Sequence, residues 1–258
     1  MPFSAFYEPA GPDTFVSTPA TAGPWDPSTQ HAGPPSALIA RAFERHEPVE
    51  GQRLARVALD ILRPVPVAPL TLRLRTARPG KRITLIEAVV EARGQEVVYA
   101  RGWRLSGSPV PDLPGDDVDV PDLPPEGDHR AWPRAHLDGY MAAMDWRFVD
   151  GAFTEPGPAR VWMRPRVPLV ADELTSPASH ALLVADSGNG VSALLDPGEW
   201  LFVNVDLTVA LHRPPVGEWV LLDARTTIDE GVGVTTSRLS DRQGPVGRGM
   251  QTLLVTAR

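Results

Sequence analysis

The two halves of this 258-residue sequence show the same order of predicted elements, and this repeat is the feature that most limits the folds open to the chain. Each half begins with a short strand, continues with a glycine-containing apolar helix and ends with four strands. The segment 62–66 (LRPVP) follows a long strand in the first half and aligns with 212–216 (HRPPV) in the second. Chance similarity between β-rich segments is the alternative, but we interpret the chain as one unit duplicated in tandem.

The predicted helices begin near residues 34 and 177. Strands are predicted at 14–18, 54–62, 70–76, 82–92, 96–105, 145–148, 159–166, 200–212, 218–229, 231–241 and 246–256. Between the halves, residues 106–133 are rich in Pro and Asp and poor in apolar side chains, which is typical of a linker. We therefore expect an N-terminal domain at 1–107, a linker at 108–138, and a C-terminal domain at 139–258 that carries the active site.

One helix followed by a long antiparallel sheet predicts a sheet curled around its helix, and two such units placed side by side can continue one sheet and hide an edge from each. This architecture is the hotdog fold. The expected fold class is thus α+β, a tandem (double) hotdog with two long antiparallel sheets, each wrapped around a central helix.

The charge balance, with 25 Lys and Arg against 32 Asp and Glu, gives a net charge of −7 and argues against a nucleic-acid or anionic-membrane partner. The sequence contains no Cys, so disulfides, thiolate catalysis and Cys-bound metal are excluded. The first residues lack a basic start followed by an apolar run, and no stretch approaches the length of a membrane span. We expect a cytoplasmic protein.

The second helix contains an acidic residue in an apolar setting. Residues 181–195 are apolar on nearly every side, as in a helix enclosed by other structure, and Asp186 lies in the middle of this segment. An ionised carboxylate buried there costs several kcal/mol unless it is paired or faces a wet cleft. Asp186 is therefore a candidate functional residue.

Two later strands add polar candidates. In strand 201–212, alternation places Asn204 and Asp206 on one face, where simple solvation is the alternative interpretation. The other face, which covers the helix, carries Leu201, Val203, Val205, Leu207, Val209 and Leu211. In the last strand, Gln251 shares a face with Gly247 and Gly249, and strand glycines often mark the close approach of a ligand or another backbone. Gln251 either ties down a neighbouring loop or orients a water and a carbonyl in a cleft.

Together these residues favour hydrolysis without a covalent nucleophile. Asp186 would act as general base, while Gln251 and Asn204 would position the water and polarise the attacked carbonyl. Gly-x-Ser-x-Gly and His clusters with metal-ligand spacing are absent from the sequence, so we expect neither a metal nor a cofactor. At the entry to the first helix, His31 and Gly33 could bind substrate, although a structural role is the common one for a loop histidine.

The sequence resembles the acyl-CoA thioesterase II-like family of double hotdog proteins over nearly its whole length. The resemblance rests on 31–35 (HAGPP), 160–164 (RVWMR), 185–190 (ADSGNG), 205–209 (VDLTV) with His212 and Arg213, and Gln251. It implies hydrolysis of acyl-CoA to free acid and CoA, with water activated by an Asp that matches Asp186 and a Gln that matches Gln251. The family's Thr falls on Asn204, where this sequence departs from the pattern.

Two other functions remain open. A hotdog hydratase or dehydratase would pair an Asp with a nearby His, and no His follows Asp186 at close spacing. A non-catalytic protein that binds acyl-CoA or acyl carrier is the other alternative, with Asn204 marking a decayed site. For the thioesterase, the expected partner is an acyl-CoA or acyl-carrier thioester, with no nucleic acid and no membrane. We also expect a homodimer or larger homo-oligomer, because exposed sheet faces of this fold usually find a partner.

Overall fold

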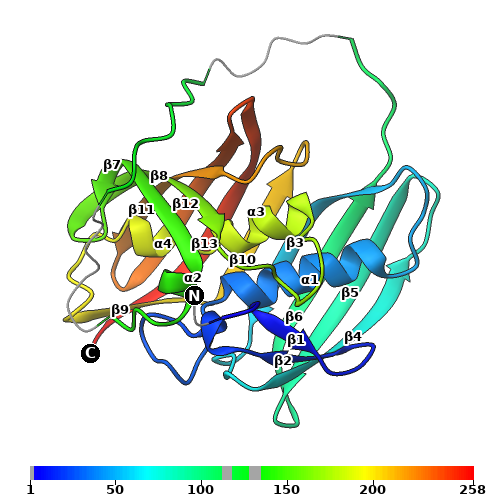
Figure 1. Ribbon diagram of the computed structural model, residues 1–258, viewed down its shortest axis with the longest axis horizontal. Helices are drawn as coiled ribbons and strands as arrows, with labels where there is room; N and C mark the ends of the chain where they lie inside the picture. Colours follow the sequence, from blue (N-terminus) through cyan, green and yellow to red (C-terminus); the bar gives the residue numbers. More distant parts are fainter. Residues whose placement is uncertain (1–2, 112–117, 128–134) are drawn as a thin grey trace.

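The computed structural model describes residues 3–111, 118–127 and 135–258, which form a large antiparallel sheet around two main helices (Figure 1). In the first half the elements are β1 (Tyr7–Pro9), β2 (Thr14–Ser17), the 3₁₀ turn Pro19–Thr21, α1 (Gly33–Arg45), β3 (Arg53–Ile61), β4 (Pro69–Arg78), β5 (Ile83–Ala92) and β6 (Gln95–Leu105). In the second half they are α2 (Tyr140–Ala143), β7 (Met144–Ala152), β8 (Glu155–Pro165), α3 (Pro177–Ala185), α4 (Gly188–Val191), β9 (Trp200–Asn204), β10 (Asp206–Leu211), β11 (Val220–Asp229), β12 (Val232–Asp241) and β13 (Gly244–Ala257).

The strands of the described residues form one continuous 13-stranded sheet, so the two predicted sheets are joined edge to edge. The order is β1-β2-β4-β5-β6-β3-β10-β13-β12-β11-β8-β7, and β9 also pairs with β13. The halves join where β3 pairs with β10, with Leu59 opposite Leu207 and Val57 opposite Val209. This pairing satisfies the backbone groups that would otherwise be free at an edge of each half.

The strand order is symmetric about this junction. Reading outward, β3, β6, β5 and β4 lie on one side and β10, β13, β12 and β11 on the other. Each set follows a helix in the sequence, as the repeat predicted. The predicted short strand at 145–148 is longer in the structure, where β7 pairs with β8.

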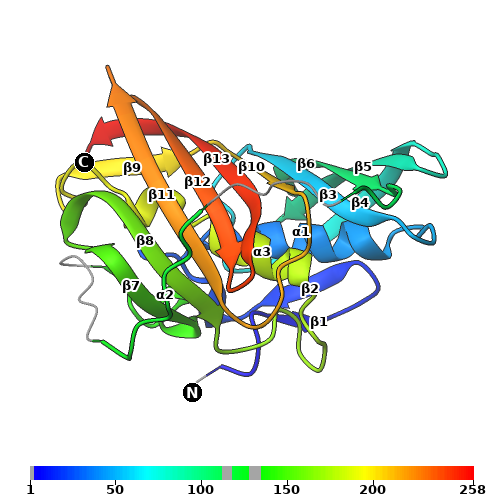
Figure 2. The same ribbon diagram turned by 90° about the horizontal axis from the view of Figure 1, so that it is seen from above.

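Helices α1 and α3 lie next to each other against the concave face of the sheet (Figure 2). One hydrophobic core joins both halves, because Leu38 and Phe43 of α1 belong to the same buried cluster as Leu182 and Val184 of α3. The helices approach closely at Gly33, where a Cβ atom would lie 2.5 Å from the backbone oxygen of Leu183. A side chain at this position would push the helices apart.

The apolar segment that begins near residue 177 is not one continuous helix. Helix α3 ends at Ala185, Asp186 is its C-cap, and the short helix α4 begins at Gly188. Asp186 therefore lies at a break between two helices rather than in the middle of one.

The proposed linker at 108–138 lies partly outside the described residues, because 112–117 and 128–134 are not described. Its described parts contain no helix or strand. The Trp162 indole N–H donates to the Pro121 backbone oxygen at 3.2 Å, so one described part contacts β8. Within the described residues, no helix combines the length and apolar character needed to cross a bilayer.

Candidate active site

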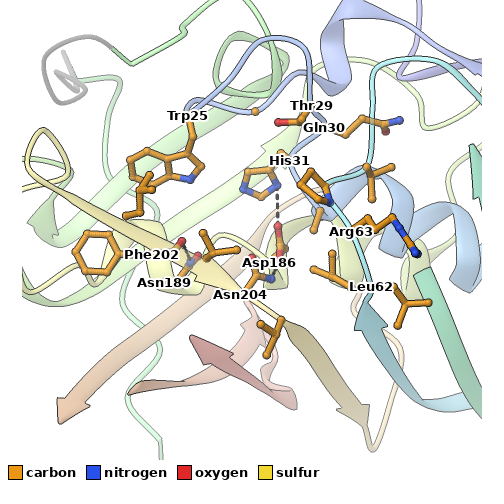
Figure 3. A pocket seen from close by; sticks show the side chains of 18 residues that line it. Trp25, Thr29, Gln30, His31, Leu62, Arg63, Asp186, Asn189, Phe202 and Asn204 are labelled. Atoms are coloured by element: carbon orange, nitrogen blue, oxygen red, sulfur yellow. Dashed lines mark hydrogen bonds and ion pairs between the residues drawn. The ribbon is translucent and has the colours of Figure 1, made fainter. Parts of the chain in front are cut away.

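Asp186 is the centre of a buried polar cluster at the break between α3 and α4. Only 3% of its surface is exposed. Its Oδ1 accepts hydrogen bonds from Asn204 Nδ2 at 2.8 Å and from Gln251 Nε2 at 3.2 Å, while Oδ2 lies 3.0 Å from His31 Nδ1 (Figure 3). Four segments that are distant in sequence thus converge on one carboxylate.

His31 reaches Asp186 from the start of α1. Its ring stacks on Tyr140, with centroids 3.7 Å apart and planes 7° from parallel. Burial lowers the pKa of His31, and this effect outweighs the negative charge of Asp186, which raises it. The imidazole is therefore neutral near pH 7.

In neutral His31, one ring nitrogen carries the proton and the other accepts a hydrogen bond. Nδ1 lies 3.0 Å from Asp186 Oδ2 and also 3.1 Å from the backbone N–H of Gly33. With the proton on Nδ1, His31 donates to Asp186 Oδ2; with the proton on Nε2, Nδ1 accepts from the Gly33 N–H instead. The bond between His31 and Asp186 therefore depends on which ring nitrogen carries the proton.

Gln251 lies behind Asp186 and fixes its position. The Gln251 Nε2 also donates to the Asp186 backbone oxygen at 3.1 Å, and Oε1 accepts from the Asn189 backbone N–H at 3.1 Å. Gln251 is buried, and both ends of its carboxamide bond to the segment around Asp186. Of its two predicted alternatives, these bonds match the tying down of a neighbouring segment, since they link α4 to β13; the orientation of a water and a carbonyl by Gln251 stays a prediction.

Asn204 faces Asp186 because the predicted strand 200–212 is interrupted. Between Asn204, which pairs with Leu253, and Thr208, which pairs with Met250, this strand has one residue more than β13. The extra residue would leave the Thr252 backbone N–H without a partner in the strand ladder, and Asp206 Oδ1 accepts a hydrogen bond from it.

The interruption reverses the predicted faces of β9. Val203 and Val205 are 46% and 45% exposed, whereas Phe202 is 4% exposed and Asn204 points inward. The expectation that Val203 and Val205 cover the helix is therefore wrong, because one extra residue shifts the alternation to the opposite face. Beyond it, Leu207, Val209 and Leu211 face the core as predicted.

A cavity of about 360 Å³ opens beside the carboxylate. Asp186, Asn204 and His31 lie between its two ends (Figure 3). Trp25 and Phe202 line one end, and Leu62 and Arg63 line the other. This volume is within the range of small-molecule sites in proteins.

The predicted site residues do not all reach this cavity. His31, Asp186 and Asn204 line it, Gln251 stands behind Asp186, and Gly33 is buried between the two helices with its N–H directed at His31. A substrate-binding role of Gly33 stays a prediction. Among the described residues, no group of three or more His, Asp or Glu side chains is arranged to hold a metal ion.

Two partners of the site could not be assigned from the sequence. Spacing along the chain argued against a His near Asp186, yet folding brings His31 to it from the other half. Tyr140 supports the ring of His31, and its hydroxyl donates to the Leu183 backbone oxygen at 2.7 Å and lies 3.0 Å from Ser187 Oγ. Tyr140 follows the linker segment, where no local pattern in the sequence marked it.

Comparison with known proteins identifies the family. The model for the acyl-CoA thioesterase C-terminal domain matches residues 118–255, and the model for the N-terminal domain matches residues 21–105. The first of these alone covers more than half of the chain. The protein belongs to the acyl-CoA thioesterase family, as the sequence resemblance predicted, and it is a thioester hydrolase of acyl-CoA.

Solved structures with low sequence identity share the fold. A protein of Thermobifida fusca, assigned provisionally as a thioesterase II, has 17% identity and a TM-score of 0.76, with 99% of each chain covered. A protein of unknown function with a hot dog fold from Alicyclobacillus acidocaldarius has 16% identity and a TM-score of 0.75, covering 97% of this chain and 96% of that one. An acyl-CoA thioesterase II from Mycobacterium marinum has 15% identity and a TM-score of 0.66, covering 98% and 95%. No curated protein sequence matches the chain.

Proposed function

We propose that the protein hydrolyses acyl-CoA by direct attack of a water molecule that Asp186 activates. The observation that carries this proposal is the position of the Asp186 carboxylate. It lies at the wall of the cavity and is held by Asn204 and Gln251 at 2.8 and 3.2 Å. A carboxylate has about four acceptor positions, so one remains for a water beside these two donors and His31.

In the proposed reaction, Asp186 takes a proton from water while the water oxygen bonds to the thioester carbonyl carbon. The tetrahedral intermediate then collapses, the carbon–sulfur bond breaks, and the thiolate of CoA takes from Asp186 the proton that came from water. Asn204 touches the water through its carbonyl oxygen and the carboxylate through its amide. Gln251 is a positioning residue, since it acts through Asp186.

The contact between His31 and Asp186 also favours a second candidate, hydration of an enoyl-CoA. An Asp and a His beside one cavity could deliver water to a carbon–carbon double bond and a proton to the neighbouring carbon. A non-catalytic role as an acyl-CoA binding protein has no comparable support, because the amide of Asn204 bonds directly to the carboxylate.

One assay separates these functions. The protein is incubated with acyl-CoAs of graded length and a thiol reagent, and in parallel with an enoyl-CoA whose absorbance reports hydration. We expect release of CoA with kcat reduced at least 100-fold in Asp186→Asn, which has nearly the same shape but cannot take the proton. Binding of acyl-CoA without turnover, or hydration of enoyl-CoA without release of CoA, would contradict the proposal.

The organisation around this site is proposed on the same basis. We propose that residues 1–107 and 139–258 are two hotdog units joined by the segment 108–138, supported by the symmetric strand order about the β3–β10 junction. A cytoplasmic location, a homodimer or larger assembly, and the use of an acyl carrier in place of CoA stay predictions from the sequence.

A further inference from the structure

Two further cavities continue from the aromatic end of the main cavity. The first is a space of about 20 Å³ between Met141, Trp146 and Phe153, and it shares the walls Trp25, His31 and Asn189 with the main cavity. The second has a volume of about 280 Å³ and lies at the turn between β7 and β8, which includes Phe153. These two cavities share the walls Phe153, Gly190 and Val191. The three spaces therefore follow one another from Asp186 toward the β7–β8 turn.

The two ends of the main cavity suit different parts of a thioester. Leu62 is about half exposed, and Arg63 beside it is exposed and donates to the Glu96 backbone oxygen at 2.7 Å. This open end fits the CoA arm, whose phosphates are anionic. At the other end Phe202 is buried and Trp25 leads into the small space, so this enclosed apolar end fits an acyl chain (Figure 3).

Phe153 separates the small space from the outer cavity. The side chain is buried, and its ring meets Trp146 edge to face with centroids 5.0 Å apart and Phe148 with centroids 4.9 Å apart. These contacts hold the ring in place. A space of about 20 Å³ has room for a group about the size of one water, so a longer acyl chain meets Phe153.

Gly190 provides an independent way to narrow the passage between the small space and the outer cavity. It lines both the small space and the outer cavity, and a Cβ atom added to it would meet no atom within 4 Å. The Cβ of a larger side chain at residue 190 therefore has room, and the atoms beyond it would occupy the space that the two cavities share.

We propose that the acyl group extends from Asp186 past Asn189 into this passage, and that Phe153 is the residue that limits the substrate to short acyl chains. The inference rests on the proposed thioesterase function. Without the ring of Phe153, the outer cavity would receive the distal carbons of a medium-length acyl chain.

The test compares kcat/KM for acyl-CoAs from butyryl to dodecanoyl. We expect the wild-type protein to prefer short chains, and Phe153→Ala to raise the ratio of decanoyl to butyryl kcat/KM at least tenfold. Phe153→Leu fills more of the space than Phe153→Ala and disturbs folding less, so it should raise this ratio less. Adding Gly190→Leu to Phe153→Ala should reverse the gain by closing the passage from the other wall. Far-UV circular dichroism and the unfolding midpoint show that each variant is folded.

Leu62→Ala is the matched control at the open end. We expect it to change KM for all acyl-CoAs by a similar factor and to leave the length preference unchanged. If Leu62→Ala shifts the preference while Phe153→Ala and Phe153→Leu do not, the acyl chain lies at the other end and the inference is overturned. An unchanged length preference in all of these variants also overturns it, whereas a wild-type protein that releases no CoA from any acyl-CoA rejects the proposed function instead.

Discussion

His31 Nδ1 and Asp186 Oδ2 lie 3.0 Å apart, so the protonation of the ring affects the proposed base directly. The proposed base must be unprotonated when water enters. We expect His31 to act in its neutral form, with Nδ1–H donating to the carboxylate, because an imidazolium would make the carboxylate a weaker base. Stacking on Tyr140 keeps the imidazole in the orientation that this contact requires.

The pH dependence of the reaction tests this coupling. Because burial lowers the pKa of His31, we expect the acid limb of kcat/KM that belongs to His31 to lie below pH 6.5, its ordinary pKa. In His31→Gln the amide still donates to Asp186 but does not titrate, so this limb should vanish while kcat at pH 7.5 falls about tenfold or less. A wild-type limb above pH 6.5 that His31→Gln leaves in place would show that another group controls the rate.

A second histidine links pH to stability. His180 of α3 is buried, its Nε2 has no hydrogen-bond partner among the described residues, and burial lowers its pKa to about 4. Below pH 6.5 the unfolded chain binds a proton that the folded protein does not. Stability should thus decrease as the pH falls from about 6.5 to about 4, by up to roughly 3 kcal/mol at 1.36 kcal/mol per unit.

Urea denaturation of the wild type and of His180→Leu across this range measures the effect. The variant has no titratable group at residue 180, so its free energy of unfolding should fall less steeply than that of the wild type between pH 6.5 and pH 4. Equal slopes for the two proteins would rule out His180 as the source.

At the scale of elements, the break between β9 and β10 decides where Asn204 points. One extra residue opposite Thr252 turns Asn204 inward, and Asp206 accepts the Thr252 N–H to hold this geometry. From the sequence alone, Asp206 could be interpreted as a solvated strand residue. In the structure it connects strand register to the active site.

Removal of this acceptor should act through Asn204. We expect Asp206→Ala to lower kcat about 10-fold to 100-fold and to change KM for acyl-CoA less than threefold, since the loss lies in the orientation of the water. Asn204→Ala combined with Asp206→Ala should cost little more than either change alone, because both act through the contact between Asn204 and Asp186. Additive losses in the double variant would show that Asp206 acts independently of Asn204.

The sequence predicted the regular helices and strands but not the break between β9 and β10. Periodicity predicted α1, the long strands and the acid in an apolar segment, because local burial patterns carry those features. It failed at Val203 and Val205, since a single extra residue exchanges the faces of a strand and leaves no local signal. The pairing of His31 with Asp186 depends on how the two halves pack and therefore cannot be read from spacing.

At the scale of the whole molecule, the halves are joined by the β3–β10 pairing and by one core shared between α1 and α3. The active site depends on this junction, because His31 belongs to the first half and Asp186, Asn204 and Gln251 to the second. The close approach at Gly33 fixes the distance between the two helices that bring His31 to Asp186.

Unfolding should therefore be a single cooperative transition. In urea, circular dichroism and tryptophan fluorescence should report the same midpoint, because neither half keeps its sheet edge or core when the other unfolds. Gly33→Ala should lower that midpoint, because the added Cβ meets the Leu183 backbone oxygen. We expect its free energy of unfolding to fall by about 1 to 3 kcal/mol. Two separate transitions would show that the halves are stable on their own.

The central claim is that water, and not the Asp186 carboxylate itself, attacks the thioester. It is tested most directly by a single turnover in H₂¹⁸O with enzyme in excess over acyl-CoA, followed by mass spectrometry of the free acid and of the peptide that contains Asp186. Direct attack predicts one ¹⁸O atom in the acid and none in the peptide. An unlabelled acid with ¹⁸O in Asp186 would reveal an acyl-enzyme anhydride and contradict the account.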